Sequence, residues 1–145
     1  MIQRIAFMTL AAAALLLGAC VKYTDGPFMS LRSKQERVAN NWKAGQVFRN
    51  NLDETDRYEV FGMNFTKAGR LTWQIQLRGQ PLVETAAAWE LASVKEQVKL
   101  TFDLKDPVTG ETRLLFMDIR RLAENELWLQ YLSEGDYYEV RLVDN

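Results

Sequence analysis

The chain has 145 residues, with 18 basic and 19 acidic side chains and a formal net charge of −1. This balance, without a basic block, argues against nucleic acid as a partner. The sequence contains no histidine and a single cysteine. An intrachain disulfide is therefore excluded, and the commonest general base at neutral pH is absent. The length is sufficient for one domain with its own hydrophobic core.

The N-terminus has the order of charge and apolar residues that secretory signals require. Arg4 supplies a positive charge, residues 5–17 form an uncharged apolar run, and the small pair Gly18-Ala19 precedes Cys20. This run of about 13 residues is too short to cross a bilayer core of about 30 Å. We therefore predict that residues 1–19 are a cleaved signal peptide.

The end of this segment, Leu17-Gly18-Ala19-Cys20, resembles the lipobox of bacterial lipoproteins. The resemblance implies that Cys20 carries the lipid that anchors the protein in a membrane, with a linker at 20–29 and a domain at 30–145. Val21 stands where an aspartate is the usual inner-membrane retention signal, which favours the outer membrane. A plain signal peptide with an unrelated cysteine is the alternative. Whether the domain faces the periplasm or the cell exterior stays open.

Residues 30–41 carry a helical pattern. Ser30 is a suitable N-cap, and Leu31, Val38 and Trp42 share one stripe of the helix. We expect a short helix whose apolar side covers part of the fold that follows.

From Trp42 onward the hydrophobic period is two. Leu71, Trp73, Ile75 and Leu77 alternate with polar residues, as is typical of half-buried antiparallel strands. Short connections rich in turn residues separate the segments. The pattern predicts strands at about 42–49, 57–66, 70–78, 83–91, 97–105, 111–121, 126–132 and 137–143.

Loop lengths predict which residues face one another across the hairpins. The expected pairs are Phe65 with Leu71, Met63 with Trp73, Ile75 with Thr85, Trp73 with Ala87, Leu71 with Trp89, Tyr131 with Tyr138, and Leu129 with Val140. The apolar faces agree in every pair, which indicates one continuous meander. Closing eight strands into an up-and-down barrel removes both exposed edges and buries the apolar face, and the helix would cover one end. A two-layer sandwich is the alternative.

The order of these segments resembles the small lipocalin-like lipoproteins of diderm bacteria. The resemblance lies in residues 30–34, 38–42, 87–91 and 125–129, with tryptophans at 42, 89 and 128. It implies an all-β, lipocalin-like antiparallel barrel with a short N-terminal helix. Ala87 and Asn40 stand where such proteins often have the glycine of a Gly-x-Trp motif, so the resemblance implies no particular ligand.

Catalytic groups are scarce. The serines have no evident base partner, the glycines form no phosphate-binding loop, and the acidic residues 50–56 do not have the spacing of a calcium loop. We expect neither an enzyme nor a cofactor nor a metal site.

The predicted interior contains no charged residue, so a ligand inside the barrel should be small and apolar. The candidate contacts are Trp73, Thr85, Ala87, Trp89, Phe102, Tyr131 and Tyr138. The alternative is that these side chains simply fill the barrel, because eight strands leave little room.

A second candidate site lies outside. Leu114, Phe116, Trp128, Leu132 and Tyr137 take the outward parity on adjacent strands and would form an apolar patch for an envelope protein. The alternative is a solvated surface on which Trp128 pairs with Arg141 through a cation–π contact. The sequence thus favours a membrane-anchored binding protein over an enzyme, with an interior ligand first and an accessory docking role second.

Overall fold

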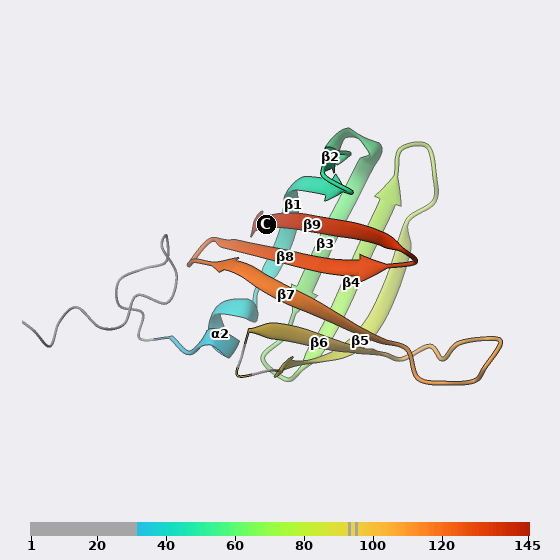
Figure 1. Ribbon diagram of the computed structural model, residues 1–145. Helices are drawn as coiled ribbons and strands as arrows, with labels where there is room; N and C mark the ends of the chain where they lie inside the picture. The colour runs from blue at the N-terminus through green and yellow to red at the C-terminus, as the bar shows by residue number, and fades with distance from the viewer. Residues whose placement is uncertain (1–31, 93, 95) are drawn as a thin grey trace, which may run out of the picture.

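Figure 1 shows the computed structural model, in which residues 32–92, 94 and 96–145 are described. The expected signal peptide, the lipid site Cys20 and the expected N-cap Ser30 lie outside these residues. The domain that follows is built almost entirely of antiparallel strands (Figure 1).

Eight strands form a closed barrel, as predicted, and not a sandwich. Each strand pairs with the next along the chain, and β1 pairs with β9 to close the ring. The barrel strands are β1 (Asn41–Arg49), β3 (Tyr58–Phe65), β4 (Arg70–Leu77), β5 (Val83–Ala92), β6 (Gln97–Phe102), β7 (Leu114–Leu122), β8 (Glu126–Ser133) and β9 (Asp136–Asp144). A two-residue strand, β2 (Leu52–Asp53), and a 3-10 helix at Thr55–Arg57 join β1 to β3.

The N-terminal helix α2 (Lys34–Val38) is shorter than the predicted segment 30–41. Its N-cap is Ser33 and not Ser30, because the Ser33 hydroxyl accepts from the Glu36 N–H while the Glu36 carboxylate accepts from the Ser33 N–H. Val38 is fully buried, and the Trp42 indole N–H donates to the Val38 carbonyl at 2.9 Å. The helix therefore closes the barrel end at which the β3–β4 and β7–β8 turns lie (Figure 1).

The buried residues among those described are all hydrophobic, and they form one core inside the barrel. Two residues that the alternation places inward, Val83 and Leu104, are exposed instead. Val83 is 59% exposed because it begins β5 at the rim of the barrel, and Leu104 is 75% exposed because β6 ends at Phe102. Beyond Phe102 the chain turns away, since the Asp106 carboxylate accepts from the Val108 and Thr109 N–H groups.

Two of the three hairpin registers were predicted correctly. Phe65 faces Leu71 and Met63 faces Trp73 across a turn with Gly69 at φ +84°. Tyr131 faces Tyr138 and Leu129 faces Val140, because Glu134 and Gly135 take the two positive φ angles of a tight hairpin turn.

The β4–β5 register differs from the prediction by two residues. Trp73 faces Thr85 instead of Ala87, Leu71 faces Ala87 instead of Trp89, and Ile75 faces Val83 instead of Thr85. The first pair of this ladder is Ile75 with Val83, so residues 76–82 lie between the paired segments, whereas the predicted loop would have paired Leu77 with Val83. Since the shift is even, every side chain keeps its predicted face.

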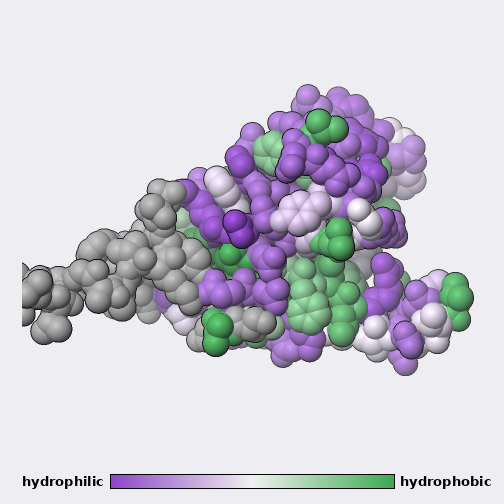
Figure 2. All heavy atoms as spheres, in the orientation of Figure 1, coloured by the Kyte–Doolittle hydropathy of each residue, from purple (hydrophilic) through white to green (hydrophobic). Residues whose placement is uncertain are grey.

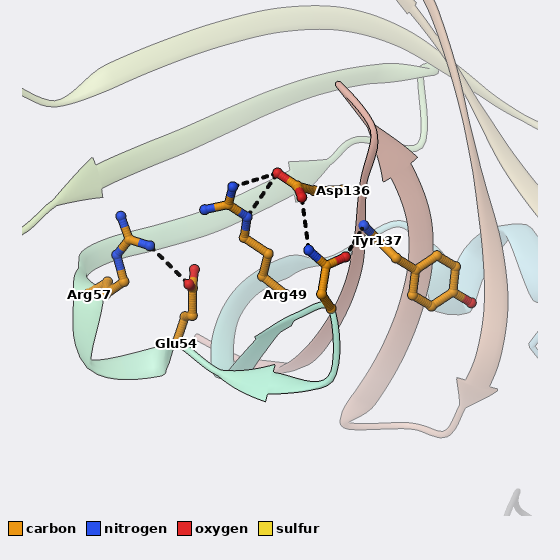
Figure 3. Close-up of polar contacts among 6 residues, drawn as sticks. Arg49, Glu54, Arg57, Asp136 and Tyr137 are labelled. Carbon is orange, nitrogen blue, oxygen red and sulfur yellow. Dashed lines mark hydrogen bonds and ion pairs between the residues drawn. The ribbon is translucent and has the colours of Figure 1, made fainter.

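One seam of the barrel is covered by β2 and the 3-10 helix. β1 pairs with β3 only from Asn41 to Lys43, and further along β1 the Val47 carbonyl accepts from the Glu54 N–H at 2.8 Å. Figure 3 shows how the end of β1, just before this segment, is held to β9. Asp136 accepts from both Arg49 and Asn50, and the Asn50 side-chain oxygen accepts from the Tyr137 N–H. Arg57 and Glu54 form an ion pair on the same segment.

Candidate ligand pocket

A pocket of about 360 Å³ enters the end of the barrel opposite α2. This end carries the β4–β5, β6–β7 and β8–β9 connections (Figure 1). The pocket is lined by Trp73, Ile75, Thr85, Phe102, Arg113, Leu114, Leu115, Leu132, Ser133 and Glu134. Its volume lies at the lower end of the range for small-molecule sites.

Three of the predicted ligand contacts, Trp73, Thr85 and Phe102, line this pocket. Thr85 and Phe102 are only partly buried, which leaves the Thr85 side chain accessible from the pocket. They come from three adjacent strands, and Trp73 and Thr85 face each other across the β4–β5 pair. The inward parity of neighbouring strands thus places an indole, a hydroxyl and a phenyl ring at one site.

Two further predicted contacts, Tyr131 and Tyr138, do not line the pocket but are connected to it through Trp73. The Trp73 ring meets the Tyr131 ring edge to face, with centroids 5.8 Å apart, and Tyr131 stacks on Tyr138 at 5.2 Å. Phe61 and Tyr58 extend this row of rings towards the same end. Burial raises the pKa of both Tyr131 and Tyr58, so their hydroxyls stay neutral and keep a proton to donate.

The indole nitrogen of Trp73 is unusual among the buried polar atoms. Trp73 is 8% exposed, and its Nε1 is buried without a hydrogen-bond partner among the described residues. The other two core indoles, by contrast, are satisfied: Trp42 donates to Val38 and Trp89 donates to the Thr66 carbonyl, both at 2.9 Å. An unsatisfied buried donor costs about 1–3 kcal/mol, which a ligand acceptor could offset.

The remaining two predicted contacts, Ala87 and Trp89, do not line the pocket. Ala87 is fully buried between Leu71 and Phe102, its neighbours on β4 and β6. Trp89 packs edge to face on Phe65 at 5.4 Å in the half of the barrel that α2 closes. In this half Trp42, Met63 and Leu71 are also fully buried.

Two charged residues at the mouth were not among the predicted contacts. Arg113 lies with its guanidinium 5.7 Å from the centroid of the Phe102 ring, and Glu134 occupies the β8–β9 turn. Both side chains are exposed. Arg113 has the same parity as the inward residues Leu115 and Met117 but lies at the rim, just before β7 begins, whereas Glu134 lies in a turn, to which strand parity does not apply.

The outer face carries the apolar residues that the sequence placed there, with one exception. Leu114, Phe116 and Leu132 are 52%, 46% and 63% exposed, and Tyr137 is exposed nearby. Figure 2 shows hydrophobic side chains gathered between β7 and β8 on this face. Trp128 is only partly exposed because Arg141 and Arg121 lie 4.2 and 5.2 Å from the centroid of its ring.

Other kinds of site find little support in the described part of the chain. No group of three or more histidine, cysteine, aspartate or glutamate side chains is arranged to hold a metal ion there. The carboxylates at 53 and 54 contact Thr55 and Arg57 instead. Among the same residues, no helix has the length and apolar character needed to cross a membrane.

Comparison with known proteins identifies the fold. No family model matches the chain, and no curated protein matches it. The crystal structure of a lipocalin-like protein from Bacteroides uniformis is similar, with a TM-score of 0.53 and 15% identity over 75% of this chain and 99% of that one. An uncharacterized protein from Bacteroides eggerthii aligns at 11% identity over 71% of this chain and 97% of its own, with a TM-score of 0.45.

These observations define the class of the protein as a closed, eight-stranded antiparallel barrel with an end pocket. The similarity to the Bacteroides uniformis protein makes the fold lipocalin-like.

Proposed function

We propose that this protein is a membrane-anchored lipoprotein whose barrel binds a small, mainly apolar molecule in the half opposite α2. The observation that carries the proposal is the pocket of about 360 Å³, which reaches Trp73, Thr85 and Phe102 inside the barrel. The fold supports it as well, because an eight-stranded barrel is wide enough to hold one small ligand when part of its interior is left unfilled.

The lining indicates the chemistry of the ligand. Ile75, Phe102 and Leu115 offer apolar contacts, whereas Thr85 and Ser133 offer hydroxyl groups. Arg113 at the mouth would attract an anionic head group. An amphipathic molecule fits best, with its apolar part inside and a polar or acidic group near Arg113.

The membrane attachment is proposed from the sequence. Lipid on Cys20 would hold the domain close to the membrane surface. Because Val21, and not an aspartate, follows the cysteine, we place this anchor in the outer membrane. We also propose that the protein binds without catalysing a reaction, because no histidine is present in the chain to serve as a general base.

Two fluorescent probes with the same aromatic skeleton test the site. N-phenylnaphthylamine is neutral, and anilinonaphthalenesulfonate adds one sulfonate to it. We expect both to bind the protein at one saturable site, and Arg113→Gln should weaken the sulfonate at least about threefold while leaving the neutral probe unchanged. Equal effects on the two probes would show that Arg113 does not interact with the charged group of the bound probe.

The second test fills the pocket with a larger side chain. Thr85→Phe places a larger side chain among the lining residues and should abolish binding of both probes. Thr72→Phe is the matched control, because Thr72 lies next to Trp73 on β4 and has the opposite, outward parity. Unchanged binding by Thr85→Phe, or an equal loss in Thr72→Phe, would contradict the proposed pocket.

A second candidate function is docking on an envelope protein. The exposure of Leu114, Phe116, Leu132 and Tyr137 on one face favours it. Replacing Phe116 and Trp128 by serine should then remove a protein that co-purifies from membranes. The same set of partners for the variant and the original protein would argue against docking.

A further inference from the structure

The pairing of β7 with β8 stops halfway along the strands. It runs from Leu122↔Leu127 to Asp118↔Gln130 and does not continue to the positions where Phe116 would face Leu132. Figure 1 shows the two strands close together at the α2 end and diverging towards the other end. The wall of the barrel is therefore split beside the pocket.

On each side of this gap, the strand remains paired with its other neighbour in the barrel. Leu114–Met117 of β7 remains paired with β6, and Tyr131–Ser133 of β8 remains paired with β9 up to the hairpin turn. The seam between β1 and β3 is also unpaired over part of its length, but β2 and the 3-10 helix, which connect the two strands, form hydrogen bonds to β1 beside it. The gap between β7 and β8 has no such cover among the described residues.

The pocket opens into this gap. Its lining includes Leu114 and Leu115 from β7 together with Leu132 and Ser133 from β8. Leu114 and Leu132 are also exposed on the outer face, next to Phe116. Apolar side chains therefore lie on the outer surface at the gap and, with Phe102 and Trp73, in the wall of the pocket inside the barrel.

We propose that this gap is the route by which the ligand enters and leaves the pocket. The inference rests on the proposed function and adds the path. Contact with apolar residues along the path removes apolar surface of the ligand from water, which is favourable at each step, whereas a polar rim offers no such gain. The polar end of the molecule would pass beside Arg113 and Glu134, which flank the opening.

The experiment locks the gap. In the full chain with Cys20→Ser, Phe116→Cys and Leu132→Cys place two thiols on opposite sides of it. They are joined by oxidation or, if they lie too far apart for a disulfide, by a short bifunctional thiol reagent. The matched control joins Asp118→Cys to Gln130→Cys, at positions that are already paired.

The readout is the rate at which N-phenylnaphthylamine binds and dissociates, measured by stopped-flow fluorescence. We expect the Phe116–Leu132 lock to slow both rates about tenfold or more relative to the unlinked thiols, since a closed gate limits exchange. The control link should leave both rates unchanged. Equal rates in locked and unlinked protein would overturn the proposed route and leave the pocket in place.

A single substitution provides a second measurement that does not depend on forming a link. Leu132→Cys, at a position 63% exposed, is compared before and after reaction with a bulky maleimide, which should slow entry of the probe. Unchanged entry after modification would contradict the route. Absence of saturable binding in every unlinked and unmodified protein would instead contradict the proposed function itself.

Discussion

The guanidinium of Arg141 lies 4.2 Å from the centroid of the Trp128 ring, on positions that face each other across β8 and β9. Arg121 approaches the same ring at 5.2 Å. The cation–π pair that the sequence suggested as an alternative to a docking surface is therefore present. Trp128 belongs to a cluster of charged neighbours, whereas Phe116 and Leu132 remain exposed beside the gap.

We predict a measurable coupling between Trp128 and Arg141. A double-mutant cycle with Trp128→Leu and Arg141→Met, followed by urea unfolding, should give an interaction free energy of about 0.5–1 kcal/mol. The same cycle with Arg121→Met should give a smaller value, because Arg121 lies farther from the ring. A coupling of zero for Arg141 would mean that the contact does not stabilise the barrel.

The link between β1 and β9 should make stability depend on pH. Hydrogen bonds from Asn50 and Arg49 lower the pKa of Asp136 below its usual value. A lowered pKa in the folded state adds stability above the unfolded pKa of about 3.9, and this stability is lost as pH falls through the folded pKa. Asp136→Asn should therefore lower the urea midpoint at pH 7, and the difference from the original protein should shrink towards about pH 2. A difference that is the same at both pH values would contradict this account.

Two buried tryptophans should respond differently to the same substitution. Trp42→Phe removes the donor to the Val38 carbonyl, whereas Trp73→Phe removes an Nε1 that has no partner among the described residues. The two changes remove similar ring volume, so the difference reports the hydrogen bond. We expect Trp42→Phe to lower the free energy of unfolding by about 1–3 kcal/mol more than Trp73→Phe. Equal losses would show that Trp73 has a partner in solution.

The proposed anchor should be separable from the barrel. Cys20→Ser should abolish incorporation of labelled fatty acid and release the protein from membranes, since Cys20 is the only cysteine. Near-ultraviolet circular dichroism should remain that of the folded protein, because the core begins at Val38. Labelling that persists in the variant would contradict lipidation of Cys20.

The faces of the strands could be predicted because alternation reports them directly. Trp73, Val98 and Leu100 are buried as expected, and each of them lies between polar neighbours in the sequence. The extent of pairing could not be predicted in the same way. A register shift of two residues in the β4–β5 hairpin leaves all faces unchanged, so the residues of the loop at 78–82 give no sign of it.

The pocket was only partly predictable for a related reason. Trp73, Thr85 and Phe102 carry the inward parity, but Arg113 and Glu134 reach the pocket through the course of the β6–β7 and β8–β9 connections. The gap beside Phe116 is likewise a property of how far two strands diverge, and the apolar run Leu114-Leu115-Phe116-Met117 fits a continuously paired strand equally well. The sequence around an outward leucine does not show whether the neighbouring strand is paired with it or has moved away.

Native mass spectrometry of the protein extracted from its own membrane tests the central claim most directly. The original protein should retain a small molecule that is released on unfolding, in addition to any covalent lipid, and Thr85→Phe should lack it while Thr72→Phe keeps it. An empty barrel in the original protein, or the same bound molecule in the Thr85→Phe variant, would contradict ligand binding in the pocket.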